Sequence, residues 1–470
     1  MYKLGVGKGA IEDSIVDSGV KDGCVISFQH HLRNGDLILI KVLKAFKLLG
    51  IKDITLAAYA IMDCHDELID FIEDGTVKKI YTNFLSAKVA RFISYGYMKE
   101  PAVLQTHGGR ISSIMSGRLN IDITFIAAPC VDINGSIICQ AEKSLGPLGY
   151  SIDDAIYSKY TVAVTDSILR EPGRYIEVNN KHINFVAFVD KIGDSKKISF
   201  KNTIPAVDEK SCRIAENTIK VIGATPLFKS GFSYQAGVGG VSLSIIRSLR
   251  DLMISRSVKS SFLLGGIMKC HVDMLHEGLV ERLYDFQCFD SCAIQSYNTD
   301  SSHYRLTAKS YVNPNDSDAF VKKLDYSVLG ANEVDMNFNA NLITGEDNLI
   351  IGGGGAHLDI CAGSKISIVT TRLTTRKTPK IVSSVNTIST PGENIDVVVT
   401  ECGIAVNPIR TDIIRILKDK GIKIATMEEL KKLAEKKSDK KIITEKGKQV
   451  VAIVEDQFGK VIDYVYSKNE

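Results

Sequence analysis

Hydrophobic and polar residues follow two periods along this chain, one typical of helices and one typical of buried strands. In the run 36–49, Leu37, Ile40 and Leu43 recur at the spacing of a helix with one buried face. The next run is apolar throughout (ITLAAYAIM), as strands buried on both faces are, and a second helical stretch comes near 65–74. Strands that alternate with helices in this way predict an α/β fold with a mostly parallel open sheet, covered by helices on both faces.

The same succession of elements occurs twice in the chain. An ungapped alignment at an offset of 206 residues pairs the segment from Ser27 (SFQHHLRNGDLILIKVLKAF) with the segment from Ser233 (SYQAGVGGVSLSIIRSLRDL). The second copy predicts a helix over 241–255, a strand (SFLLGGIM) and a helix that starts near Asp273. Because repeats are a strong architectural signal, we expect two related domains in tandem. Identical pairs at this offset include Ser27/Ser233, Gln29/Gln235, Leu37/Leu243, Ile40/Ile246, Leu43/Leu249, Ile61/Ile267, Met62/Met268, Cys64/Cys270 and His65/His271.

The repeat also suggests where the chain divides. We place the boundary in the polar stretch 205–230, which gives an N-terminal domain at 1–225 and a C-terminal domain at 226–470. The last apolar segment (VVAIVEDQFGKVIDYVY) contains two alternating runs around a glycine-containing turn, which predicts a β-hairpin. We expect this hairpin to be an antiparallel addition at the edge of a sheet.

Composition excludes several classes of protein. The 470 residues, 44% hydrophobic and 24% charged, are typical of a globular protein with two or three domains. A net charge of +3 is too small to indicate nucleic-acid binding. The longest apolar runs are far shorter than the roughly 20 residues of a membrane-spanning helix. Ten cysteines without a C-x-x-C pair match no zinc spacing, so we expect no metal. Without a signal-like first segment, the chain is expected to be cytoplasmic, with reduced thiols.

The matched loop of the second copy is a candidate oxyanion site. Gly237, Gly239 and Gly240 come directly before the predicted helix over 241–255. Free backbone N–H groups and the positive end of the helix dipole converge at such a position, which favours an oxyanion or a phosphate. The alternative is that these glycines only form a tight turn from strand to helix.

The matched loop of the first copy carries cations in place of glycines. His30, His31 and Arg33 lie there, and imidazole and guanidinium groups at a helix start suit a carboxylate or a phosphate. The alternative is a helix-capping loop whose imidazoles are simply packed. A metal is not expected, because no nearby cysteine, histidine or carboxylate completes a ligand set.

Two further segments are rich in glycine. One is a small loop (THGGR) that ends in Arg110, which is either an anion clamp or an ordinary surface arginine. The other contains four consecutive glycines, and such a run indicates a sharp bend or the close approach of a ligand. The candidate contacts in these segments are His107, Gly108, Gly109, Arg110, Gly352, Gly353, Gly354, Gly355 and Asp359.

Three carboxylates stand at positions suited to a cleft. Asp273 follows the second-copy strand, where an aspartate is also a common helix-start residue. Glu401 ends a strongly apolar run. Glu333 belongs to an alternating polar row, which we expect to face solvent or a ligand cleft, because unpaired polar groups are costly to bury. The row consists of Glu333, Asp335, Asn337, Asn339 and Asn341.

Together these motifs resemble the alpha subunit of citrate lyase, a family of CoA-transferases, over nearly the whole chain. The resemblance is carried by SFQHHLRNGD, THGGR, QAGVGGVSL, GGIMKCHVDMLHEGLVERLYDFQCFD, NEVDMNFNANLITG, GGGGAHLDICAG and TPGENIDVVVTECGIAVNP, in matching order and spacing. It implies two CoA-transferase domains of an open α/β type, in agreement with the repeat.

The resemblance implies an acyl exchange. Citrate replaces acetyl on the thioester of an acyl carrier protein, whose prosthetic group is CoA-like, with acetyl-CoA as a surrogate; the products are citryl thioester and acetate. The implied partners are citrate, the acyl carrier (gamma) subunit and the citryl lyase (beta) subunit, in a homo-oligomer within a larger complex. Citramalate transfer and CoA-thioester hydrolysis are the alternative activities.

The resemblance also implies roles for individual residues. In the wider transferase family a glutamate nucleophile stands in an I-H-[ST]-E-M run, whereas the aligned segment here (CHVDM) has Asp273 at that place. Aspartate is one carbon shorter, which argues against covalent catalysis. The resemblance to the citrate lyase branch implies direct transfer without an acyl-enzyme, with Asp273 as a positioning or acid–base residue and Glu333 as its rival. Gly239 and Gly240 would stabilise the oxyanion. The implied substrate contacts are His30, His31, Arg33, Asn337, Asn339 and Glu401.

Overall fold

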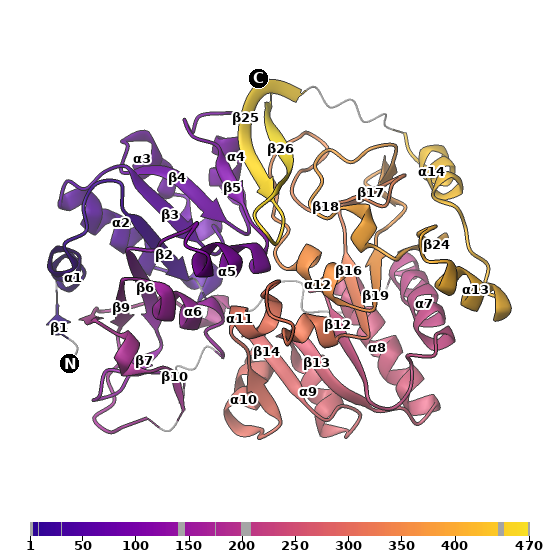
Figure 1. Cartoon of the computed structure of the whole chain (residues 1–470), viewed down its shortest axis with the longest axis horizontal. Helices are drawn as coiled ribbons and strands as arrows, with labels where there is room; N and C mark the ends of the chain where they lie inside the picture. Colours follow the sequence, from indigo (N-terminus) through magenta and orange to yellow (C-terminus); the bar gives the residue numbers. More distant parts are fainter. Residues whose placement is uncertain are drawn as a thin grey trace.

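Two large open sheets, each flanked by helices, lie side by side in this protein (Figure 1). Most neighbouring strands are parallel, which confirms the predicted α/β fold class. The structure is a computed structural model that describes residues 3–7, 9–29, 31–139, 146–173, 175–198, 208–439 and 446–468.

The first sheet has ten strands. Each neighbouring pair in it is parallel except the last pair, which is an antiparallel hairpin. In spatial order the strands are β1 (Lys3–Val6), β11 (Phe185–Phe188), β9 (Tyr160–Thr165), β6 (Ile123–Ala128), β2 (Val25–Gln29), β3 (Ile54–Ala58), β4 (Val77–Thr82), β5 (Ala102–Leu104), β25 (Lys446–Glu455) and β26 (Val461–Lys468).

The second sheet has eight strands and is again parallel except for its last pair. In spatial order they are β15 (His303–Arg305), β14 (Leu283–Cys288), β13 (Ser260–Ile267), β12 (Phe232–Ala236), β16 (Tyr326–Gly330), β19 (Ile366–Thr370), β23 (Val397–Thr400) and β24 (Gly403–Val406). Short strands form three smaller sheets: β7 (Cys130–Val131), β8 (Ile137–Ile138) and β10 (Ile176–Val178); β17 (Glu333–Asp335), β18 (Ala340–Asn341) and β22 (Ile381–Val382); and β20 (Thr374–Thr375) with β21 (Thr378–Pro379).

Helices follow most of the strands, at bounds close to those predicted. The predicted helix near Asp273 begins four residues earlier, at Lys269, because His271 accepts a hydrogen bond from the Met268 N–H and caps the first turn. The helices are α1 (Ala10–Ser18), α2 (Ile38–Leu48), α3 (Leu68–Glu73), α4 (Ala87–Ser94), α5 (His107–Met115), α6 (Tyr150–Tyr157), α7 (Glu209–Ala224), α8 (Gly240–Ser255), α9 (Lys269–His276), α10 (Ser291–Thr299), α11 (Ala308–Val312), α12 (His357–Gly363), α13 (Thr411–Asp419) and α14 (Met427–Lys436).

The sequence repeat corresponds to a structural repeat. In the first sheet the strands run β9-β6-β2-β3-β4-β5, and in the second they run β19-β16-β12-β13-β14-β15, so the matched strands occupy matched positions. Local contacts repeat as well. The Nδ1 atom of His65 accepts from the Met62 N–H at 3.2 Å, and His271 accepts from the Met268 N–H at 3.1 Å. The tandem α/β architecture follows directly from this agreement.

The C-terminal hairpin returns to the first sheet. Strands β25 and β26 are antiparallel to each other, as predicted, but β25 joins the sheet parallel to β5 (Figure 1). The described residues 446–468 thus extend a sheet built from the other end of the chain. Helix α7, which precedes the boundary set at 225/226, packs on α8 and on β23 of the second sheet. We keep the two-domain division as a proposal.

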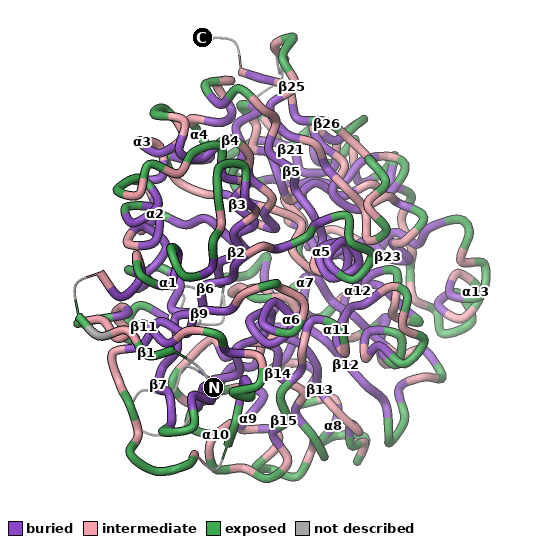
Figure 2. Tube along the Cα trace, turned by 60° about the vertical axis from the view of Figure 1, so that its left-hand side comes forward, coloured by how far each residue is buried: buried purple, intermediate pink, exposed green. Residues whose placement is uncertain are grey.

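Each sheet has its own apolar core, and a third cluster of buried side chains joins the two. The buried residues follow the strands of both sheets, while many exposed residues lie on loops and outer helix faces (Figure 2). None of the helices in the described part of the chain has the length and apolar character required to cross a membrane.

Candidate functional site

An aromatic cluster fills the seam between the two sheets. Tyr59 follows β3 and Tyr150 begins α6, while Phe286 and Tyr311 come from the second half. Ring centroids lie 4.1 Å apart for Tyr59 and Tyr150, 4.8 Å for Tyr150 and Phe286, and 5.2 Å for Phe286 and Tyr311. His107 is 5.2 Å from Tyr150 by the same measure. These residues are far apart in the chain, so no local pattern marked them, and only His107 was predicted.

His107 is a neutral group in this cluster. Its Nε2 atom is hydrogen-bonded to the Tyr59 hydroxyl. Burial, with a smaller effect of the Arg110 charge, lowers the pKa of His107 to about 3. The buried Nδ1 atom has no hydrogen-bond partner among the described residues. When Tyr59 donates, the proton of His107 is on Nδ1, so the imidazole offers an N–H donor at the seam.

The glycine loop of the second copy ends in a helix N-terminus that no side chain of the described residues caps. The Gly237 N–H bonds to the Val328 carbonyl at 2.9 Å, which ties the loop to β16. Gly239 is the N-cap residue of α8, with a φ of +146° that L side chains rarely adopt. Among the described residues, no side chain accepts from the first N–H groups of this 16-residue helix. The loop is partly exposed, so these donors can bind an anion or an oxyanion.

The corresponding loop of the first copy is buried. His31 bonds through Nε2 to the Ala127 carbonyl, and burial lowers its pKa to about 4. The Arg33 guanidinium lies 3.9 Å from the centre of the Phe289 ring and donates to the Cys288 carbonyl at 3.3 Å, so it reaches across the seam. Burial lowers the pKa of Arg33 to about 9, and the group stays protonated at neutral pH. The third predicted residue, His30, lies outside the described residues.

The THGGR loop begins α5 and is bound by a carboxylate from the other half of the chain. Asp359, in α12, accepts from the Thr106 hydroxyl at 2.8 Å and from the Gly108 N–H at 2.9 Å. Burial raises the pKa of Asp359 to about 7, although these hydrogen bonds oppose the shift. A Cβ atom at Gly108 would lie 2.5 Å from that carboxylate, and one at Gly109 would lie 2.7 Å from the Asp456 carbonyl. The two glycines allow close packing of protein against protein, and their role toward a cofactor stays a prediction.

Arg110 is buried, and its terminal nitrogens Nη1 and Nη2 already donate to groups of the protein. It is 1% exposed and forms an ion pair of 2.8 Å with the buried Asp154. It also donates to the Ser27 hydroxyl at 2.9 Å and to the Ala57 carbonyl at 3.1 Å. These contacts anchor α5 to the first sheet, and a buried arginine of this kind needs such partners.

The run of four glycines packs against the first half of the chain. A Cβ atom at Gly353 would lie 2.0 Å from the Asn83 carbonyl oxygen, so only glycine fits there. Gly355 has a φ of +52°, and its carbonyl accepts from the His107 N–H at 3.1 Å. Around Gly354 there is more space, because a Cβ atom there would lie 3.9 Å from its nearest neighbour, the Cβ atom of Ser389. Contact of this run with a ligand stays a prediction.

The polar row around Glu333 is mostly buried and forms its own network. The Oε1 atom of Glu333 accepts from the Asn341 amide and from the Asn386 N–H, both at 2.8 Å. Asp335 accepts from the Asn339 N–H at 3.0 Å. The expected exposure of the row is therefore wrong for Glu333, Asp335 and Asn341, which are at most 3% exposed, whereas Asn337 is exposed and Asn339 half-buried.

The two remaining carboxylates, Asp273 and Glu401, each have partners of their own. Asp273 lies on α9, partly exposed, and pairs with Lys269 at 2.6 Å on the same helix. Glu401, at the end of β23, accepts from the Leu373 N–H at 2.8 Å and lies 3.7 Å from the Lys210 ammonium group. These contacts hold both carboxylates in place on their own elements, and their roles toward a substrate stay predictions.

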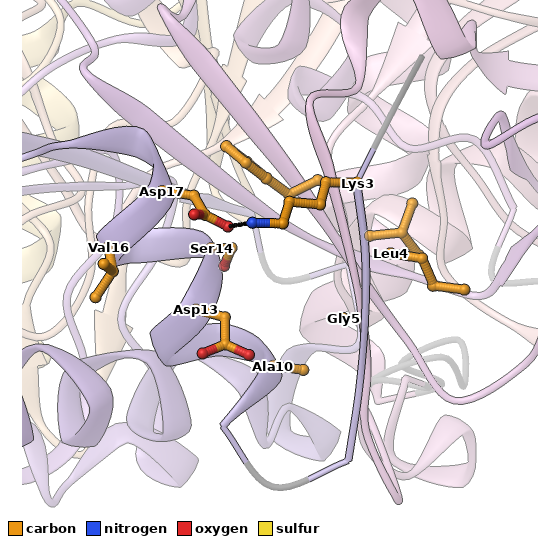
Figure 3. A pocket seen from close by; sticks show the side chains of 10 residues that line it. Lys3, Leu4, Gly5, Ala10, Asp13, Ser14, Val16 and Asp17 are labelled. Atoms are coloured by element: carbon orange, nitrogen blue, oxygen red, sulfur yellow. Dashed lines mark hydrogen bonds and ion pairs between the residues drawn. The ribbon is translucent and has the colours of Figure 1, made fainter.

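A cavity away from the seam is not lined by the predicted site residues. A cavity of about 330 Å³ lies at the outer edge of the first sheet, between β1 and α1 (Figure 3). The Lys3–Asp17 ion pair crosses it, and none of the predicted site residues lines it. The seam therefore remains the candidate site.

Two mostly parallel sheets of matched strand order define a tandem open α/β fold, which solved CoA-transferases share. A 4-hydroxybutyrate CoA-transferase from Porphyromonas gingivalis has a similar fold, with a TM-score of 0.56 and 16% identity over 92% of this chain and 94% of that chain. At this identity the likeness concerns the fold alone.

Sequence comparison defines the family more narrowly. The family model described as citrate lyase, alpha subunit (CitF), matches residues 7–468. The citrate lyase alpha chain of Escherichia coli K12 is 37% identical over 98% of this chain and 90% of that protein. A structure of a citrate lyase alpha subunit from Streptococcus mutans, in complex with citrate, has a TM-score of 0.97 and 38% identity, and the match covers 100% of this chain and 92% of that chain. The chain belongs to the citrate lyase alpha subunit family.

Proposed function

We propose that this chain is a citrate CoA-transferase that exchanges acetyl for citrate on the thioester of an acyl carrier protein. The observation that carries the proposal is the 38% identity, over the whole chain, to an alpha subunit whose structure holds citrate. The thioester belongs to a CoA-like prosthetic group, and acetyl-CoA serves as its surrogate. The carrier (gamma) and citryl lyase (beta) subunits are the proposed partners, in a complex that contains more than one copy of this chain.

The reaction has two acyl transfers. A citrate carboxylate attacks the acetyl thioester carbonyl, the C–S bond breaks, and the thiolate leaves with its electron pair. The product is a mixed anhydride of acetate and citrate. The thiolate then attacks the citryl carbonyl of this anhydride, which forms the citryl thioester and releases acetate. Each step passes through a tetrahedral oxyanion, so donors fixed before the reaction lower both barriers.

The uncapped start of α8 supports an oxyanion role for the second glycine loop. Gly239 and Gly240 present backbone N–H groups at the positive end of a 16-residue helix. Because no described side chain caps this end, the donors are available when the negative charge develops. Gly237 fixes the loop to β16 through its bond to Val328. These contacts support the proposal that oxyanion stabilisation and cofactor binding use separate loops.

Charge at the seam supports binding of a polycarboxylate. The cation of Arg33 is buried and already reaches from the first half of the chain to the second. A buried guanidinium interacts more strongly with a carboxylate than an exposed one does, because less water screens it. The neutral His107 adds a donor without adding charge. Arg33 and His107 are therefore the side chains that we assign to citrate and to the thioester arm.

A direct test uses the purified chain with acetyl-CoA and citrate. The expected products are citryl-CoA and acetate in equal amounts, measured by mass spectrometry and chromatography. Absence of exchange, even with the acetylated carrier protein supplied, would contradict the proposal. Release of CoA without any acid acceptor identifies a hydrolase instead, and a higher turnover with citramalate than with citrate identifies the related transferase.

Direct transfer is tested separately. In this mechanism neither Asp273 nor Glu333 becomes acylated, and both are retained as positioning or acid–base candidates. The chain is incubated with acetyl-CoA alone and treated with hydroxylamine, and its peptides are mapped. A hydroxamate on either carboxylate would overturn direct transfer while leaving the overall reaction in place.

A further inference from the structure

Three buried side chains of different chemistry converge at one edge of the second sheet. The Cys288 thiol lies 2.9 Å from Oδ2 of Asp285, and Nε2 of His303 lies 3.2 Å from the same oxygen. The three potential ligand atoms lie within 4.8 Å of one another. Asp285 and Cys288 have no exposed area, and His303 is 6% exposed. A thiol, an imidazole and a carboxylate form a ligand set that Zn²⁺ uses in proteins.

This cluster continues to the protein surface through hydrogen bonds. The Nδ1 atom of His303 lies 3.0 Å from the Ser296 hydroxyl, which lies 2.6 Å from Oδ2 of Asp300. The same Asp300 oxygen lies 2.9 Å from Nε2 of His276, which is exposed. With the two contacts above, the chain of groups has five polar contacts, and each one needs a hydrogen or another cation between its heavy atoms.

With both imidazoles neutral, the hydrogens that these groups carry are one too few, so that either a proton or a metal ion completes the set of contacts. With both carboxylates ionised and both imidazoles neutral, the thiol, the serine hydroxyl and each of the two imidazoles supply one hydrogen. Four hydrogens cannot satisfy the five contacts. If Ser296 donates to Asp300, then His303 donates through Nδ1, and its Nε2 lone pair faces the Asp285 carboxylate. Two lone pairs at 3.2 Å repel unless a cation lies between them.

We propose that this cluster is a binding site for one zinc-like divalent transition-metal ion. The ligands are the Cys288 thiolate, one Asp285 oxygen and Nε2 of neutral His303. Zinc bonds to such atoms are about 2.0–2.3 Å long, which places ligand atoms about 3.3–3.6 Å apart in a tetrahedron. The nitrogen–oxygen distance is already 3.2 Å, whereas the sulfur–oxygen distance of 2.9 Å has to lengthen when the ion binds.

The groups around the ligands fit this assignment. In metal sites the second nitrogen of a histidine usually donates to an oxygen partner that orients the ring, and here Ser296 and Asp300 form such a pair. The other Asp285 oxygen accepts from the Gln287 N–H at 2.8 Å. Access is provided by a cavity of about 440 Å³, whose lining includes His303 and Asp300.

The test measures metal retention by the intact chain. The purified protein is incubated with zinc chloride, passed over a chelating resin and analysed by inductively coupled plasma mass spectrometry. We expect about one zinc ion per chain, as for a site with three protein ligands. Cys288→Ser and His303→Gln should lose most of this metal. Cys24→Ser, which changes another buried thiol in the first sheet, should retain it.

Cobalt gives a readout that a purely structural role would not produce. With Co²⁺ in place of zinc, a thiolate-to-metal charge-transfer band should appear in the wild-type protein and in the Cys24 variant, and should be lost in Cys288→Ser. Ser296→Ala should weaken zinc binding about 10- to 100-fold, because it removes the partner of the histidine ligand. If the wild-type chain retains no zinc, or binds cobalt without the thiolate band, the proposal is wrong. This result does not depend on whether any variant folds, nor on the transferase activity.

Discussion

The matched helices of the two copies start at different positions, and the two starts differ in their capping. In the first copy the Asp36 carboxylate accepts from the N–H groups of Ile38 and Leu39 at 3.2 and 3.1 Å, so the start of α2 is closed. In the second copy the helix begins four matched positions earlier, at Gly240, so that Ser242, the residue matching Asp36, lies within the first turn of α8. No described side chain caps the start of α8. One fold thus serves for stability in one half and, in our proposal, for ligand binding in the other.

The loops before these helices differ in the same sense. Gly239 matches Arg33 at the offset of 206 residues, and both have a positive φ, of +146° and +53°. At this position the first copy has the Arg33 side chain, which reaches across the seam, and the second copy has a glycine without a side chain. The comparison teaches that a loop left open for a ligand can be found by comparison with its repeat, in which side chains fill the same space.

The largest expected effect comes from placing a side chain at the open loop. Gly239→Ala forces a φ of +146° on an L residue and displaces the proposed donors, so kcat for citrate-dependent exchange should fall about 100-fold. The matched control is Gly231→Ala, at a φ of +94° with open space around it. Both variants should have similar unfolding midpoints, measured in urea. Equal activity in the two variants would contradict the oxyanion role.

The second prediction closes the open helix start. Ser242→Asp places a carboxylate in the first turn of α8, beside its free N–H groups, so it should compete with an oxyanion for this helix end and lower kcat/KM by at least about tenfold. Ser242→Asn, which is similar in size but uncharged, is the control and should lose less activity. An active aspartate variant would show that the reaction does not use this end of the helix.

The third prediction concerns the filled loop. Arg33→Gln removes the buried cation of the seam, and KM for citrate should rise about tenfold, which corresponds to about 1.4 kcal/mol of binding free energy. KM for acetyl-CoA should change less. Arg250→Gln, at an exposed ion pair with Glu277, serves as the control and should leave both constants unchanged. If the substitution raised only KM for acetyl-CoA, Arg33 would be assigned to binding of the thioester and not of citrate.

The fourth prediction addresses stability in the first copy. Asp36→Ala removes the acceptor at α2 and the partner of the buried His65, whose Nε2 atom lies 3.2 Å from the carboxylate. The free energy of unfolding should fall by about 1–3 kcal/mol, measured by urea denaturation. In the second copy, Ser242→Ala should change it by less than about 0.5 kcal/mol. Similar losses in both copies would remove the contrast between them.

The last prediction concerns a pH dependence of stability, which lies outside the comparison of the two loops. Burial raises the pKa of Asp359, and of Asp153 in the first half, from 3.8 to about 7. Between these values the unfolded chain has lost the proton while the folded chain retains it. Stability therefore decreases as pH rises from about 4 to about 7 and is level above that range. In the Asp359→Asn variant the thermal unfolding midpoint should change less with pH in this window. An unchanged pH dependence of the midpoint would contradict the assignment.

Much of the fold follows from local patterns, because apolar periodicity reports which face of an element is buried. The repeat predicted that both halves of the chain have the same α/β architecture, although it did not give the order of the strands. The return of β25 to β5 was not predictable, since pairing between residues about 350 positions apart leaves no local mark. Compensation over long distances hid other features: Arg110 is buried only because Asp154 neutralises it.

The site was also predicted only where its residues are close together in the sequence. Glycines before α8 are adjacent in the chain, so their convergence at a helix start follows from the sequence. The aromatic cluster draws Tyr59, Tyr150 and Tyr311 from separate elements, and only the fold brings them together. The buried row around Glu333 has acceptors and donors that alternate, so its members satisfy one another, and sequence alone does not distinguish such a network from an exposed face.

The hairpin that completes the first sheet also sets an order of events during translation. Strand β5 leaves the ribosome early, yet its neighbour β25 is synthesised only after the whole second sheet. Until then the nascent chain exposes an unpaired strand edge, which is a template for association with other chains. The first sheet is thus the first to be made and the last to be finished, and its open edge needs protection from other chains for that interval.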